Sequence, residues 1–168
     1  ATANSKNVVV DSLMLEAVAE GANLSDEDRD TLSSYGTFHL APVGAVLIEQ
    51  GQSRGKLFFT LSGLMHARRV DEGNDILLGK IESGEWVGEI DLFDPSSAVC
   101  SVVAVEPSQY WEITREDLED FLNNYNAAGI MLMIGLATTL SQRIRGITAK
   151  LAEQADINKF RDMTVDFE

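Results

Sequence analysis

Between Thr37 and Thr114 the chain alternates short β-prone segments with turn residues, which limits the folds it can adopt. The segments are rich in β-branched, aromatic and other apolar residues, and residues such as Gly, Pro, Asn, Asp and Ser separate them. About eight short strands at such regular spacing indicate a β-sandwich or a jelly-roll barrel. The strands are expected at residues 37–40, 45–48, 57–61, 64–70, 75–81, 86–87, 98–104 and 110–113.

Helix signals flank the predicted strands on both sides. Residues 11–19 predict a short helix that Gly21 ends, because glycine tolerates the left-handed conformation found just past a helix. Ser25, followed by three acidic residues, is a candidate N-cap for a second helix. Thr114 is placed in the same way to cap a helix after the last strand.

The longest periodic pattern in the chain lies in residues 127–155. Apolar residues recur there at alternating spacings of three and four, which is typical of a helix that packs along a partner helix. The alternative is that this stripe covers the chain's own barrel, but the helix is too long for so small a barrel. We therefore expect a homodimer through residues 128–153. The stripe consists of Ile130, Met133, Ala137, Leu140, Ile144, Ile147 and Leu151.

These patterns divide the chain into four parts. An N-terminal helical segment occupies residues 1–23, the β-roll residues 24–126, and the long helix residues 127–155. Residues 156–168 are polar and are expected to form a C-terminal tail. The fold class is thus mainly β with flanking helices: a double-stranded β-helix (jelly roll) of about eight strands, short N-terminal helices and a long C-terminal dimerisation helix.

The amino-acid composition limits the binding partners and the cellular compartment that we expect for this chain. With 27 acidic and 13 basic residues the formal net charge is −14, which repels nucleic acid and anionic membranes. The longest apolar run, 127–136, is shorter than a membrane span, and no signal-peptide core opens the chain. The single cysteine, Cys100, lies in an apolar run and is interpreted as a structural thiol. We expect a cytoplasmic protein that binds neither nucleic acid nor membranes.

A glycine- and carboxylate-rich stretch precedes the seventh predicted strand and reads Gly84-Glu85-Trp86-Val87-Gly88-Glu89-Ile90-Asp91-Leu92. It resembles the phosphate-binding cassette of the cyclic nucleotide-binding domain, the sensor part of bacterial catabolite-activator-like regulators. The turn at 42–51, the strand at 57–63 and the long helix at 140–151 resemble other motifs of that family in the same order. The resemblance covers about residues 24–155.

The resemblance implies a stand-alone regulatory or sensor protein that binds cyclic AMP or cyclic GMP and signals by repositioning its long helix. Gly88 would let the backbone approach the ligand, and Glu89 would accept a hydrogen bond from the ribose 2′-hydroxyl. Backbone N–H groups after Gly88 would hold an anion. The ligand-binding residues that the resemblance implies are Gly88, Glu89, Ile90, Ser97, Ala98, Val99, Ser101 and Thr148.

The cassette departs from the family pattern at one position. Counted without gaps from Gly88-Glu89, the arginine that clamps the cyclic phosphate in the family is Ala98 here. A charge-assisted hydrogen bond contributes about 1.5–3 kcal/mol, so its loss weakens binding by roughly tenfold to over a hundredfold. Two hypotheses follow: a sensor with weakened ligand binding, or a degenerate domain that acts only as a protein-interaction and dimerisation module.

An enzyme on the same roll is the third hypothesis, and the residues give it little support. His39 and His66 lie in different strand regions and lack the spacing of a metal site. The sequence shows no Ser-His-Asp, P-loop or Cys-x-x-Cys arrangement. We expect neither catalytic residues nor a metal or cofactor.

Overall fold

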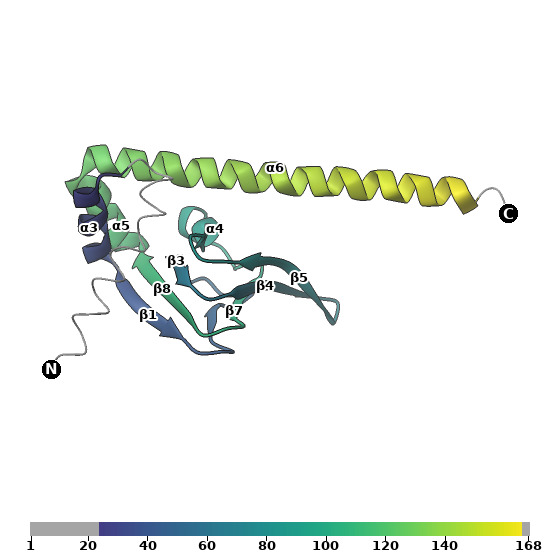
Figure 1. Ribbon diagram of the computed structural model, residues 1–168, viewed down its shortest axis with the longest axis horizontal. Coiled ribbons are helices and arrows are strands. Elements are labelled where there is room, and N and C mark those ends of the chain that lie inside the picture. Colours follow the sequence, from purple (N-terminus) through teal and green to yellow (C-terminus); the bar gives the residue numbers. More distant parts are fainter. Residues whose placement is uncertain (1–23, 166–168) are drawn as a thin grey trace.

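The computed structural model describes residues 24–165, and within that range the chain forms a β-roll with short helices at one end and a long helix that runs along the roll and beyond it (Figure 1). The helix predicted at residues 11–19 lies outside the described residues. The elements in chain order are α3 (Asp26–Tyr35), β1 (Thr37–Ala41), β2 (Val46–Ile48), β3 (Lys56–Ser62), β4 (Met65–Asp71), β5 (Asn74–Ile81), β6 (Trp86–Val87), α4 (Glu89–Phe93), β7 (Ser101–Ala104), β8 (Ser108–Thr114), α5 (Arg115–Asn124) and α6 (Asn126–Val165).

The eight strands form two antiparallel four-stranded sheets. One sheet has the order β1-β8-β3-β6 and the other the order β2-β7-β4-β5. In β3, Leu57, Phe59 and Leu61 pack with residues of α3, α5 and α6, whereas Phe58 packs with residues of the second sheet. The first sheet is therefore covered by helices on one face and by the second sheet on the other. The predicted fold class, a jelly roll with flanking helices and a long C-terminal helix, is confirmed.

The predicted caps begin their helices as expected. Ser25 Oγ accepts a hydrogen bond from the Asp28 amide at 3.1 Å, and Thr114 Oγ1 accepts one from the Asp117 amide at 3.2 Å. Each bond satisfies one of the free amides of a first helical turn. The two helices contact each other and, with the beginning of α6, close one end of the roll (Figure 1).

The strand predicted at residues 98–104 is shorter in the structure, because β7 begins only at Ser101. The Ala98 amide donates to the Gln52 carbonyl at 2.9 Å, and the Gly51 amide donates to the Ala98 carbonyl at 2.8 Å. Ala98 is thus paired with a loop rather than with a neighbouring strand. The apolar run extends further than the sheet because sequence periodicity does not show where a pairing partner ends.

The helix α6 is longer than the pattern predicts and continues to Val165. One of its faces buries Ala128, Leu132 and Leu136 in the core at a spacing of four residues. The predicted heptad stripe lies on a different face: Ile144 is 63% exposed and Leu151 is 65% exposed. Past Arg143 the described side chains are all exposed, and the C-terminal part of the helix extends beyond the roll (Figure 1).

By length and composition alone, α6 could cross a membrane, since Asn126–Met163 has 38 residues and a most apolar window with a mean hydropathy of 1.3. Only 22% of that window is buried within the molecule. Core helices of soluble proteins pass the same test.

Two glycines with similar backbones allow a test of the turn that joins the sheets. Gly63 (φ +91°) and Gly73 (φ +81°) both adopt a left-handed conformation, but an added Cβ on Gly63 would lie 2.6 Å from the Pro107 carbonyl oxygen. An added Cβ on Gly73 meets nothing within 4 Å. Gly73→Ala should cost only the conformational strain, about 1–2 kcal/mol. Gly63→Ala should lower the free energy of unfolding in urea by clearly more; equal losses in the two variants would contradict this packing.

Candidate functional site

The site begins where β6 ends and the chain turns sharply at Gly88. This residue has φ +89°, and an added Cβ would lie 2.5 Å from the Lys56 carbonyl oxygen and 3.2 Å from the Phe58 ring. Only glycine fits this combination of left-handed backbone and close approach. The turn starts α4 and places Glu89, its first residue, with a side chain only 8% exposed.

Glu89 is held by an arginine from the long helix. Arg143 Nη1 donates to Glu89 Oε1, and Arg143 Nη2 donates to the Trp86 carbonyl oxygen. The arginine side chain is 32% exposed. A carboxylate as buried as Glu89 requires such a partner, because an unpaired buried charge is costly. One side chain thus connects α6 to both ends of the cassette turn.

The sequence analysis did not identify Arg143, although its position in the helix indicated that it faces the roll. It lies seven residues, or about two helical turns, after Leu136, on the face that packs against the roll. A long polar side chain at a core-facing position is expected to meet a buried polar group. Because Glu89 is 54 residues away in sequence, the pairing became visible only in the structure.

The residues around Ala98 are held by a loop between β2 and β3. Ser101 Oγ accepts a hydrogen bond from the Gln50 amide at 2.9 Å, which adds to the backbone pairing of Ala98. Ser97 and Val99 are exposed, as is Ile90 on α4. Of the residues that the resemblance implied, Gly88 and Glu89 are therefore in the cassette turn, and Ala98 and Ser101 are joined to the loop.

Asp91 ties the same loop to α4. Its carboxylate accepts hydrogen bonds from Ser53 Oγ at 2.6 Å and from the Arg54 and Gly55 amides at 2.8 Å each. Burial raises the pKa of this carboxyl, but the hydrogen bonds to the ionised form outweigh burial and lower the pKa below its ordinary value. Asp91 thus has a structural role in the site.

A second arginine reaches the cassette from β4. Arg69 Nη1 donates to the Val99 carbonyl oxygen at 2.7 Å. The pKa of the adjacent Cys100 thiol is raised by burial and by the Glu89 carboxylate, while the Arg69 charge acts in the opposite direction. Cationic side chains thus reach the cassette from β4 and α6, and the Glu89 carboxylate is buried there.

Thr148, the last residue that the resemblance implied, is an exposed residue of α6. Its hydroxyl donates to the Ile144 carbonyl oxygen at 2.8 Å, as is common for threonine within a helix. Its hydrogen bond is thus internal to the helix, about one and a half turns after Arg143.

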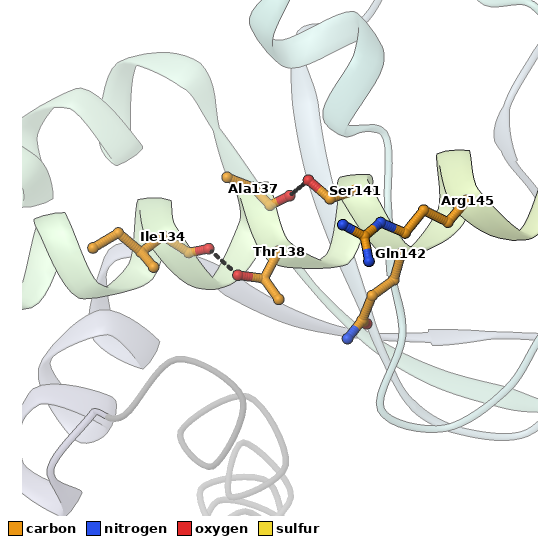
Figure 2. A pocket seen from close by; sticks show the side chains of 6 residues that line it. All are labelled: Ile134, Ala137, Thr138, Ser141, Gln142 and Arg145. Carbon is orange, nitrogen blue, oxygen red and sulfur yellow. Dashed lines mark hydrogen bonds between the residues drawn. The ribbon is translucent and has the colours of Figure 1, made fainter.

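A separate hollow of about 410 Å³ lies on the exposed side of α6 (Figure 2). Figure 2 shows that Thr138 and Ser141 direct their hydroxyls back to the carbonyls of Ile134 and Ala137, at 2.8 and 2.9 Å. These hydroxyls donate within the helix, and Gln142 and Arg145 also line the hollow. The hollow does not include the cassette.

Histidines and carboxylates are not grouped as a metal site in the part of the chain that the structure describes. His39 hydrogen-bonds Thr37 and pairs with Glu112 in the first sheet. His66 lies in β4, in the second sheet.

Comparison with known proteins agrees with this geometry. The chain is 28% identical over 123 residues to the cyclic AMP receptor protein of Thermus thermophilus, a match that covers 73% of this chain and 55% of the receptor. It is 27% identical over 99 residues to the human patatin-like phospholipase domain-containing protein 6, covering 53% of this chain but only 7% of that protein. The chain thus spans about half of one relative and a small part of the other.

Among solved structures, a cyclic nucleotide-binding domain from Methylobacillus flagellatus superimposes with a TM-score of 0.74 at 24% identity, covering 80% of each chain. The sequence model of the cyclic nucleotide-binding domain family matches residues 39–125, which include the cassette and both sheets except the first two residues of β1. That range is more than half of the chain's 168 residues. The chain therefore belongs to the cyclic nucleotide-binding domain family.

Proposed function

We propose that this regulatory domain senses a cyclic nucleotide at the Gly88–Glu89 turn and transmits binding through α6. The observation that carries the proposal is the contact of Arg143 with Glu89 and with the Trp86 carbonyl. A ribose hydroxyl that hydrogen-bonds Glu89 would compete with Arg143 or share the carboxylate with it. Either outcome changes the attachment of α6 to the roll, so ligand binding and helix position are thermodynamically linked.

A second function is favoured by a specific observation. Glu89 is already paired, and the position of the family arginine is the neutral Ala98. A domain whose ribose-binding carboxylate is neutralised from within could keep the fold without the ligand. Such a domain would act as a protein-interaction and dimerisation module, which is the alternative that a binding measurement must separate from the sensor.

We further propose that α6 pairs with a second copy of the chain through the heptad stripe. The stripe runs along the helix at alternating spacings of three and four, and most of its residues are exposed. A second copy fits this pattern better than a membrane does. The uncharged part of α6 ends at Gln142, after 17 residues from Asn126, and a membrane span needs about 20.

The net charge of −14 disfavours nucleic acid, and the described residues supply no metal cluster for catalysis. We propose a non-enzymatic cytoplasmic regulator.

The sensor proposal is tested by titrating cyclic AMP and cyclic GMP into the protein by calorimetry. We expect weak, saturable binding of at least one of them, together with a rise in the melting temperature. Ala98→Arg should strengthen binding roughly tenfold or more by restoring a charge-assisted hydrogen bond. The absence of both heat and thermal shift at millimolar ligand would leave only the interaction module.

The contact between α6 and the cassette is tested by Arg143→Met, with Arg145→Met as the matched control. Arg143→Met leaves the Glu89 carboxylate buried without its cation and should lower the free energy of unfolding by about 1–3 kcal/mol. Arg145 is exposed two residues further along, so its replacement should change stability by less than about 0.5 kcal/mol. Adding Glu89→Gln to Arg143→Met should recover part of the loss. Equal effects of the two arginine variants in urea unfolding would refute the proposed attachment.

The dimer is tested by sedimentation at micromolar concentration. The protein should sediment with the mass of two chains, and the double variant Ile144→Glu with Leu151→Glu should sediment as a monomer, because it places charges within the stripe. Ile157→Glu is the control, since Ile157 is exposed but does not follow the stripe's spacing. A monomeric mass for the unmodified protein would exclude the dimer.

A further inference from the structure

The cassette has lost its arginine in a chain that is strongly acidic overall. Ala98 occupies the position of the family's phosphate-binding arginine, and the formal net charge of the chain is −14. A phosphate group that enters such a site needs a local cation to offset the surrounding negative potential. The structure places one beside Ala98, on a different element from the family arginine.

Arg69 lies on the same face of β4 as two residues that belong to or pack against the core between the sheets. Side chains alternate along a strand, so Met65, Ala67 and Arg69 share one face. Met65 is fully buried in the cluster between the two sheets, and Ala67 packs against that cluster. Arg69 continues this row one residue past Arg68, which forms the last pair between β4 and β7 with Ser101.

The neighbouring arginine shows the opposite arrangement. Arg68 faces away from this row, and its Nε donates to the Asp75 carboxylate at 3.0 Å. Arg68 is therefore neutralised by an acidic residue of β5, as expected of an arginine on the outer face of a hairpin in an acidic chain. The two consecutive arginines of β4 have different surroundings, although the sequence alone does not distinguish them.

Arg69 reaches the backbone of the residue that follows Ala98. Its Nη1 donates to the Val99 carbonyl oxygen at 2.7 Å, which fixes the guanidinium at the cassette. The Cys100 thiol experiences both the Arg69 charge and the Glu89 charge. The guanidinium is therefore held near the place from which a cassette arginine would act.

The guanidinium also has donors left for a ligand. Among the described residues Arg69 forms no ion pair, whereas Arg68, Arg115 and Arg143 each have a carboxylate partner. A guanidinium has five N–H donors, and the contact with Val99 uses one of them. Arg69 is partly exposed and has no acidic partner among the described residues, in a chain where acidic residues outnumber basic ones by 27 to 13. This is the donor set that a phosphate group accepts from.

We infer that Arg69 binds the phosphate of the ligand in place of the missing cassette arginine. In this chain the cation that contacts the phosphate would come from β4 instead of from the cassette. This inference rests on the proposed sensor function for the identity of the ligand, a cyclic nucleotide, and on the contacts of Arg69 for the phosphate subsite.

The test compares Arg69→Ala with Arg68→Ala, two adjacent arginines of the same strand. Arg69→Ala should weaken cyclic AMP binding by roughly tenfold to a hundredfold, because a charge-assisted hydrogen bond is lost. Arg68→Ala should change affinity by less than about twofold. Binding of adenosine, which lacks the phosphate, should be the same in both variants and in the unmodified protein. Adding Ala98→Arg to Arg69→Ala should restore cyclic AMP binding, since it returns the cation to the cassette.

The outcomes separate this inference from the proposed function. If the unmodified protein binds cyclic AMP and Arg69→Ala binds it equally well, the sensor proposal stands and the role of Arg69 is refuted. If the unmodified protein binds no cyclic nucleotide, inorganic phosphate is titrated while the Arg69 Nε–H signal is followed by NMR, with Arg69→Lys to assign the signal. A saturable shift would support the anion site, and an unchanged signal would overturn it.

Discussion

Burial of the sheet β1-β8-β3-β6 on both of its faces is the constraint on which the remaining structure depends. The side chains of β3 alternate between the helices and the second sheet, so one strand contributes to both core clusters. The helical cluster fixes α3, α5 and the first turns of α6 against the roll. The inter-sheet cluster positions β4 and β7, from which Arg69 and Ser101 approach the cassette. A loss of packing in β3 would therefore affect the site through both the helical cluster and the inter-sheet cluster.

The long helix combines two apolar faces with one polar contact. The side of the helix that faces the roll buries Ala128, Leu132 and Leu136, and Arg143 further along contacts the cassette turn. The heptad stripe lies on another side and is largely exposed. Arg143 lies between the part of the helix that packs in the core and the part whose described side chains are exposed.

Charge decides how the cassette can function. The family places a cation within the cassette, whereas here the cations come from β4 and α6, and the carboxylate of Glu89 is already paired with one of them. A second carboxylate, Asp91, is fully engaged in holding the loop 53–55. The site thus combines a preformed backbone turn with one neutralised carboxylate and one arginine that has donors to spare.

The sequence by itself determined the class of fold, the order of its elements and the cassette turn. Alternation in the strands, the caps at Ser25 and Thr114, and the glycine at position 88 are local signals that depend on a few neighbouring residues. It also determined the heptad stripe, because periodicity shows which residues share a face.

The sequence could not show where β7 begins. The start of that strand depends on the backbone pairing of Ala98 with Gln52, which lies 46 residues earlier in the chain. Only the tertiary structure decided that Arg143 pairs with Glu89 and that Arg69, rather than Arg68, reaches the cassette. Such pairings join residues far apart in sequence, and the strand face or helix turn that makes them possible is set by packing of the whole roll.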